Sequence, residues 1–208
     1  MKNHNFVKFE PKNLMIKRFY IAITFSFLVL GTTKAQGFES GAFGAPVIKY
    51  SKIVNQSALI IGGKWGWVIN KRFAIGTGFY SLVTGVNTHY VDTQSGQTVL
   101  FKYNYGGLEL EFLALKDSKF NVTIDMLLAG GGQNFYAEKN NNAKTNFGTS
   151  DFLLWEPQID FEYELYNWLH IDAGLSYRMI SSYNKVFNVD KNELEGTTFL
   201  LNFKFGKY

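Results

Sequence analysis

In Trp155-Glu-Pro-Gln-Ile-Asp-Phe-Glu-Tyr-Glu-Leu165, apolar and polar side chains alternate without a slip. After a break at residues 166–168, the alternation resumes through Leu169-His-Ile-Asp-Ala-Gly-Leu-Ser-Tyr-Arg-Met179. A period of two places successive side chains on opposite faces of a β-strand. Two such runs joined by a very short break predict a β-hairpin with one apolar face and one charged face.

The charged face also predicts how the two strands of this hairpin are aligned. If the hairpin closes symmetrically about Asn167, Glu156 faces Arg178. Opposite charges that face each other across antiparallel strands stabilise their register, so we expect an ion pair between these two residues. The same register sets two further pairs, Glu162 with Asp172 and Glu164 with His170.

The sequence after residue 35 predicts eight antiparallel strands in one domain. The turns at residues 70–72, 116–119 and 166–168 are short, whereas residues 85–96, 134–150 and 181–195 read as long polar loops. Short turns at one end and long loops at the other are typical of an up-and-down transmembrane β-barrel. The expected strands are Ala42–Ser51, Ser57–Ile69, Phe73–Thr84, Thr98–Leu115, Phe120–Gln133, Trp155–Leu165, Leu169–Met179 and Gly196–Phe205.

One of these strands changes phase. Its apolar residues are odd-numbered up to Tyr105 and even-numbered from Leu108, on either side of Gly106-Gly107. One extra residue in a strand moves every later side chain to the opposite face. We therefore predict a β-bulge at the glycine pair.

Residues 1–35 are predicted to be an export signal peptide. Lys17 and Arg18 precede the apolar run Phe19–Leu30, and small residues lead to a cleavage site between Ala35 and Gln36. The apolar run is shorter than the ~20 residues that cross a bilayer as a helix. Met15 is an alternative start, because it would give a leader of ordinary length. Residues 36–208 then form the barrel domain.

Removing the leader changes the charge balance. The whole chain carries a net charge of +4, but residues 36–208 keep only 15 basic and 16 acidic residues. The basic character therefore belongs to the leader and does not indicate nucleic-acid binding. The chain has no cysteine, which excludes disulfides and thiolate metal sites.

The side chains at mid-strand favour lipid outside the barrel and a polar lumen. A lipocalin-like soluble barrel would show the same alternation, but with fewer charges on its polar face. Aromatic residues near strand ends predict two interfacial girdles: Tyr103, Tyr105, Trp155, Tyr177 and Tyr183 toward the loops, and Trp67, Phe73, Phe112, Phe120, Tyr163 and Trp168 toward the turns. The expected lumen charge network comprises Lys64, Glu109, Glu111, Asp125, Glu156, Asp160, Glu162, Glu164, His170, Asp172, Arg178 and Lys204.

Three glycine- and aromatic-rich segments carry a resemblance to a known family. They are Ile61-Gly-Gly-Lys-Trp-Gly-Trp-Val68, Phe73-Ala-Ile-Gly-Thr-Gly-Phe79 and Tyr105-Gly-Gly-Leu-Glu-Leu-Glu111. With the aromatic last strand, they make the chain resemble the small eight-stranded outer-membrane β-barrel proteins of Gram-negative bacteria. The resemblance implies an outer-membrane location, assembly through the C-terminal strand and no assigned chemistry.

The sequence offers little for catalysis or metal binding. His170, Asp172 and Ser176 share one strand face, but a narrow lumen gives a catalytic triad no accessible point. The pairs Glu109/Glu111 and Glu162/Glu164 could bind a hard cation. More simply, they answer basic residues expected on the same face: Lys49, Lys64, Lys102, Arg178 and Lys204. We therefore expect no enzyme activity and no cofactor.

The function that follows is a monomeric outer-membrane barrel with a structural or adhesive role, in which the long loops bind an unidentified extracellular ligand. The alternatives are a narrow channel, a lipid A-modifying enzyme and a lipocalin-like periplasmic binder.

Overall fold

The computed structural model describes residues 39–91, 96–117, 119–139, 143–183 and 189–207. The predicted signal peptide and its Ala35–Gln36 cleavage site lie outside these ranges. Residues 39–208 form one compact unit. No helix in the described ranges is long and apolar enough to cross a membrane.

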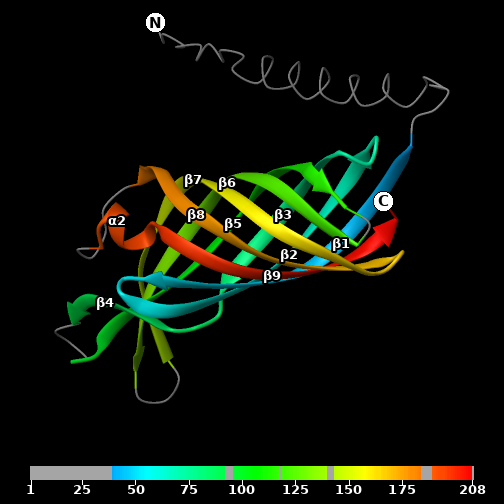
Figure 1. The fold of residues 1–208 in the computed structure, drawn as a ribbon. Coiled ribbons are helices and arrows are strands. Elements are labelled where there is room, and N and C mark those ends of the chain that lie inside the picture. Colours follow the sequence, from blue (N-terminus) through cyan, green and yellow to red (C-terminus); the bar gives the residue numbers. More distant parts are fainter. Residues whose placement is uncertain (1–38, 92–95, 118, 140–142, 184–188, 208) are drawn as a thin grey trace, which may run out of the picture. The chain divides into compact units, whose positions relative to one another are not determined.

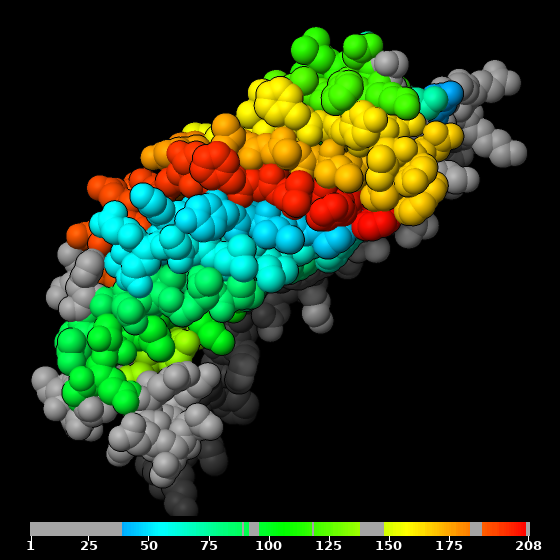
Figure 2. Space-filling model, turned by 60° about the horizontal axis from the view of Figure 1, so that its bottom comes forward, coloured from blue at the N-terminus to red at the C-terminus, as the bar shows by residue number. Residues whose placement is uncertain are grey.

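Eight antiparallel strands form a closed ring, which confirms the predicted fold. β1 pairs with β9 and β3 pairs with β5, so the sheet has no open edge between its first and last strands (Figures 1 and 2). In a closed barrel, the backbone N–H and C=O groups of every strand can hydrogen-bond to neighbouring strands, so no strand edge needs water. The ring comprises β1 (Ser40–Ile53), β2 (Gln56–Ile69), β3 (Phe73–Leu82), β5 (Thr98–Lys116), β6 (Phe120–Lys139), β7 (Ala143–Tyr166), β8 (Leu169–Tyr183) and β9 (Gly196–Lys207).

Two short elements lie at the loop end of the ring. β4 (Val86–Val91) pairs with the start of β5, and α2 (Lys191–Leu194) packs against β8 and β1. The predicted loop 85–96 therefore contains a strand, and the predicted loop 181–195 contains a helical turn.

Residues 134–150 are not the long loop that the sequence predicted. The β6–β7 ladder continues to Lys139 opposite Ala143, whereas the β7–β8 ladder begins at Phe152 and the β5–β6 ladder at Leu100 opposite Tyr136. The hairpin thus runs on past its neighbours (Figure 1). Polar composition suggested a loop, but the backbone ladder continues through the described part of this segment, and the buried side chains of Phe135 and Ala137 anchor its start.

The outward face is apolar, as predicted. On β6, exposed Phe120, Ile124 and Leu128 alternate with buried Thr123 and Asp125. Ten residue steps from Phe120 to Gly130 rise ~33 Å along a strand, or ~25 Å along the axis of a tilted barrel strand. We call this zone of outward apolar side chains the apolar belt. Its height matches the hydrocarbon band of outer-membrane barrels.

The predicted β-bulge at Gly106-Gly107 is wrong. Both ladders of β5 run through the pair without a shift, with Gly106 opposite Phe79 and Gly130, and Gly107 opposite Gly78 and Ala129. The odd-numbered side chains of β5 therefore point into the lumen on both sides of the glycine pair. What changes at this level is the lumen itself, which is charged toward the turns and aromatic toward the loops. Tyr103 and Tyr105, expected in the outer girdle, are buried inside, and Lys102 is exposed outside.

The remaining girdle residues lie mostly where the sequence placed them. Trp155 and Tyr177 are exposed toward the loop end, and Trp67, Phe73 and Trp168 are exposed toward the turns. Tyr183 is a further exception, because it packs against the buried apolar cluster and its hydroxyl donates to the Val189 carbonyl.

Candidate functional site

The lumen has two parts, which meet at the level of Gly106. We call the part beside the short turns the charged layer: Lys49, Lys64, Glu109, Glu111, Asp125, Glu156, Asp160, Glu162, His170, Asp172, Arg178 and Lys204. We call the part beside the loops the aromatic plug: Tyr80, Phe101, Tyr103, Tyr105, Phe135 and Phe152. The charged layer lies at the depth of the apolar belt.

Lys204 on β9 is the centre of the charged layer at its turn end. Its Nζ lies 2.7 Å from Glu111 Oε1, 3.0 Å from Glu162 Oε2 and 3.0 Å from Asp172 Oδ2. These carboxylates come from β5, β7 and β8, so one ammonium joins strands on opposite sides of the ring. The Lys204 side chain is fully buried, so removing it would leave uncompensated negative charge.

Lys64 on β2 has a similar role one level higher. Its Nζ contacts Asp125 Oδ2 at 3.0 Å, Glu111 Oε2 at 3.6 Å and Glu109 Oε2 at 3.7 Å. Glu111 therefore lies between the two lysines. Shared carboxylates make the layer a network in which each base stabilises several acids.

Amide side chains complete the network around Asp160. Gln158 Nε2 donates to Asp160 Oδ2 at 2.6 Å, and Asn202 Nδ2 donates to the same oxygen at 3.2 Å. The same Gln158 nitrogen lies 3.1 Å from Asp125 Oδ2. Gly174 faces Asp160 across the ladder, and a Cβ at Gly174 would lie 1.9 Å from Asp160 Oδ1. The lumen thus needs glycine at 174 because the Asp160 carboxylate occupies the space beside it.

The predicted hairpin register is right from Leu154 to Glu164, although the turn closes with Tyr166 rather than Leu165 opposite Leu169. The predicted Glu156–Arg178 ion pair is not the contact that forms. Gln158 faces Ser176 and Trp155 faces Met179, which places Glu156 opposite Arg178. Within the described ranges, the ion-pair partner of Glu156 is Lys49 on β1, 3.0 Å away, and Ser176 also donates to Glu156. The ion pair of Glu156 therefore spans the lumen from β7 to β1 and does not join the two strands of the hairpin.

Arg178 turns toward the loop end instead. Its Nε donates to the Leu194 carbonyl at 2.7 Å, and its terminal nitrogen donates to Ser51 Oγ at 3.2 Å. The guanidinium also lies 5.7 Å from the ring centre of Tyr103. Arg178 therefore connects the charged layer to the helical turn α2 and to the aromatic plug.

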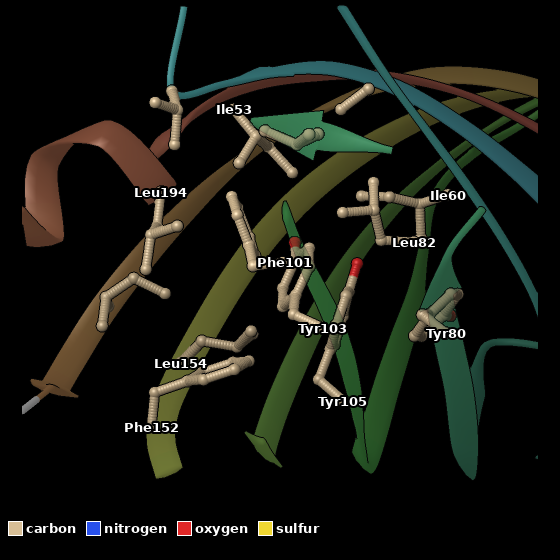
Figure 3. Packing of buried hydrophobic residues seen from close by; sticks show 14 of the residues in the cluster. Ile53, Ile60, Tyr80, Leu82, Phe101, Tyr103, Tyr105, Phe152, Leu154 and Leu194 are labelled. Carbon is tan, nitrogen blue, oxygen red and sulfur yellow. The ribbon is translucent and has the colours of Figure 1, made fainter. Parts of the chain in front are cut away.

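The aromatic plug is a continuous stack of rings. Tyr80 to Tyr105, Tyr105 to Tyr103, and Tyr103 to Phe152 have ring centroids 5.0, 5.4 and 5.5 Å apart. These spacings favour aromatic pairing. Figure 3 shows Phe101, Tyr103 and Tyr105 pointing inward from β5 among Ile53, Ile60, Leu82, Leu154 and Leu194. The plug closes the loop end of the lumen.

The two parts meet through tyrosines that contact both. The Tyr80 hydroxyl donates to Glu109, and Lys49 Nζ lies 4.0 Å from the centre of the Tyr80 ring. Cations over aromatic faces are attracted electrostatically, so the ring offsets part of the cost of burying Lys49. Tyr80 was not among the predicted network residues, and Lys49 was expected only as a same-face partner of the paired glutamates, not of Glu156. The sequence does indicate that Lys49 points inward, because it is odd-numbered in a strand whose outward residues are even-numbered.

The turn end of the lumen holds a polar cavity of about 300 Å³. It is lined by Lys71, Arg72, Glu164, His170 and neighbouring residues, so Glu164 lies at the rim rather than in the ion-pair network. The cavity reaches inward to Glu111 and Glu162. Above these residues, Lys204 and the charged layer fill the lumen.

His170 is held in the charged layer rather than in a catalytic arrangement. Its Nδ1 lies 3.0 Å from Glu162 Oε1, while Ser176 donates to Glu156. His170, Asp172 and Ser176 therefore share a strand face, as predicted, but have separate partners. The side chain of His89, a histidine in the predicted loop 85–96 without an evident base partner in the sequence, lies outside the described residues. Among the described residues, no group of three or more His, Cys, Asp or Glu side chains could hold a metal ion.

Comparisons with known proteins support the fold. Neither a protein-family model nor a curated protein sequence matches this chain. The crystal structure of Neisserial surface protein A is similar with a TM-score of 0.51 and 14% identity, over 82% of this chain and 98% of that one. The N-terminal β-barrel domain of Pseudomonas aeruginosa OprF gives a TM-score of 0.51 and 11% identity, over 80% and 96%. The chain therefore has the fold of small eight-stranded outer-membrane barrels.

Proposed function

We propose that this chain is an outer-membrane protein with a closed lumen, without enzyme activity, that binds partners through strands extending past the apolar belt. The observation that carries the proposal is the β6–β7 ladder, which continues to Lys139 opposite Ala143, beyond the point where both neighbouring ladders stop. A barrel filled with side chains offers a large partner no binding site in its lumen. Among the described residues, the extended hairpin, the β4–β5 pair and α2 are the loop-end surfaces that a partner could contact.

The apolar belt and the polar rows above it support the proposed location. The first outward polar side chains above the belt on β5 to β7 are Asn104, Lys102, Asn134 and Asp151, and Leu100 and Tyr136 follow farther out. Such residues favour water or headgroups rather than hydrocarbon. We also expect the assembly machinery to recognise β9, whose outward residues include Phe199 and Phe205.

Membrane location is tested by cell fractionation together with gel mobility of unheated and heated samples. We expect the protein in the outer-membrane fraction, with a mobility shift on heating because a folded barrel resists detergent. Recovery as a soluble periplasmic protein would contradict the proposal and favour the lipocalin-like alternative.

The binding role is tested by shortening the hairpin. Residues 137–145 are replaced by Asn-Gly, which closes a two-residue hairpin turn. The control replaces Asn55 by Gly in Val54-Asn55, the two-residue turn at the same end of the ring, and keeps Val54 because its side chain is buried. Cells displaying each protein are tested on immobilised matrix proteins and polysaccharides. We expect the shortened hairpin alone to lose adhesion, and equal adhesion by all three proteins would contradict the role of the hairpin.

A further inference from the structure

A groove on the outer face of the barrel marks the loop-end border of the apolar belt. Gly106 on β5 and Gly130 on β6 face each other, and both point outward. Phe79 on β3 flanks Gly106, and Leu153 on β7 flanks Gly130. The Phe79 ring lies over Gly106, whereas a Cβ at Gly130 would meet only Leu153. A shallow groove of about 420 Å³ runs along the two glycines beside Ile61 and Phe79.

The groove is apolar below and polar above. Leu108 and Leu128, one step toward the turns, are exposed and face each other. One step toward the loops, Ser81 faces Asn104, and Ser81 Oγ donates to Asn104 Oδ1 at 2.6 Å. Ser81 and Asn104 line the groove together with Ile61 and Phe79. The groove therefore crosses from hydrocarbon to headgroup depth.

The charges near the upper rim are unequal. Lys102 is exposed two residues above Asn104 on the same outward face of β5. Asp151 lies on the opposite side, above Leu153 and facing Gly132. A negative headgroup is thus attracted toward β3 and β5 and repelled from β7.

We propose that this groove binds an acyl chain of a phosphorylated outer-leaflet lipid of the lipid A class, with the phosphate near Lys102 and the headgroup at the Ser81–Asn104 pair. The inference rests on the proposed outer-membrane location. Within a bilayer, association depends on van der Waals contact, which small residues such as glycine allow because they let a partner approach the backbone. A narrow methylene chain fits over Gly130 beside the Phe79 ring, and the groove is open along the side that faces the proposed bilayer.

The test fills the groove and measures retained lipid. A Cβ at Gly130 would meet only Leu153 Cδ2, at 3.6 Å, so Gly130→Leu can fold. Gly44→Leu is the matched control, because Gly44 points outward on β1 and a Cβ there would meet nothing within 4 Å. Each purified barrel is loaded with lipid A or with phosphatidylglycerol in detergent, and bound lipid is counted by native mass spectrometry. The heat-dependent gel shift verifies folding.

We expect Gly130→Leu to lower lipid A retention about tenfold. The leucine side chain would occupy the space that the acyl chain needs, and overpacking of this kind costs enough free energy for a tenfold change in affinity. Gly44→Leu should retain lipid A as the unchanged protein does, and Gly130→Ala should fall between. Lys102→Gln should weaken retention of lipid A but not of its dephosphorylated form, whereas Lys52→Gln, exposed at the end of β1, should have no effect.

Equal lipid A retention by the unchanged protein, Gly130→Leu and Gly44→Leu would overturn the site. Equal retention of lipid A and phosphatidylglycerol would overturn the lipid class. Because the detergent assay does not depend on where the protein resides, a periplasmic location would refute the proposed function separately from this result.

Discussion

The two parts of the lumen are filled by opposite chemistry although the same strands form both. Between the short turns and Gly106, Lys64 and Lys204 hold carboxylates from several strands. Above Gly106, Tyr103 and Phe152 pack ring to ring. The outward face changes in the opposite sense, from the apolar belt to polar Asn104 and Lys102. At the proposed location, hydrocarbon would surround the charges, and water would surround the plug.

This difference shows what each part contributes. A buried ion network is costly to assemble and is strongly destabilised by the loss of one member. An aromatic core is stabilised by its own contacts and tolerates a change of shape more readily. We infer that the charged layer fixes which strands meet and at what register, whereas the plug closes the lumen.

The largest expected effect is at the centre of the charged layer. Lys204→Met leaves Glu111, Glu162 and Asp172 without their shared ammonium, and we expect a loss of ~3–5 kcal/mol in the free energy of unfolding. Urea unfolding in lipid vesicles measures it. Lys102→Met, at an exposed outward position, is the control and should change stability by less than ~0.5 kcal/mol. Similar losses in both variants would remove the distinction between lumen and surface lysines.

The plug should show a smaller and more forgiving response. Phe101→Ala removes a fully buried ring that contacts Tyr103 and Phe135, and we expect a loss of about 3 kcal/mol. Phe101→Leu should recover most of this loss, because a similar apolar volume is kept. If the leucine variant were as unstable as the alanine variant, ring stacking rather than apolar volume would stabilise the plug.

A double-mutant cycle separates the two candidate partners of Glu156. Glu156→Gln combined with Lys49→Met should show a coupling of about 2 kcal/mol, because these side chains meet at 3.0 Å inside the lumen. Glu156→Gln combined with Arg178→Met should give a coupling of less than ~0.5 kcal/mol. If the Glu156–Arg178 coupling were the larger of the two, the ion pair would form across the hairpin, and the Lys49 contact would be wrong.

The smallest effect is expected at the contact between the two parts. Arg178→Lys keeps the charge but cannot reproduce the paired donation to the Leu194 carbonyl and Ser51 Oγ. We expect a loss of about 1.5 kcal/mol, the contribution of a charged hydrogen bond. Faster amide exchange confined to residues 189–194 would locate the change at α2, and uniform exchange across the barrel would contradict it.

Sequence patterns predicted the strands because each strand face meets one medium along most of its length. The prediction failed on β5, where a change from odd to even apolar residues has two explanations. A bulge moves the side chains, whereas an inverted environment leaves them in place, and both give the same pattern at Tyr105 and Leu108. Only the ladders with β3 and β6 decide between them.

The lumen contacts were harder to predict than the lumen faces. Odd or even position along a strand decides which side chains point inward. Alternation in the sequence therefore predicted most of the charged layer. Which of them touch depends on ring closure and the stagger of the strands, which no local pattern records. Glu156 therefore faces Arg178 along the hairpin but bonds with Lys49 from the far side of the ring.

The central claim is that side chains close the lumen, and single-channel recording in a planar bilayer tests it most directly. Purified protein should give no steady conductance steps, because the aromatic plug and the charged layer fill the interior. Reproducible steps of one size, scaling with the amount of folded protein inserted, would contradict a closed lumen and restore the narrow channel.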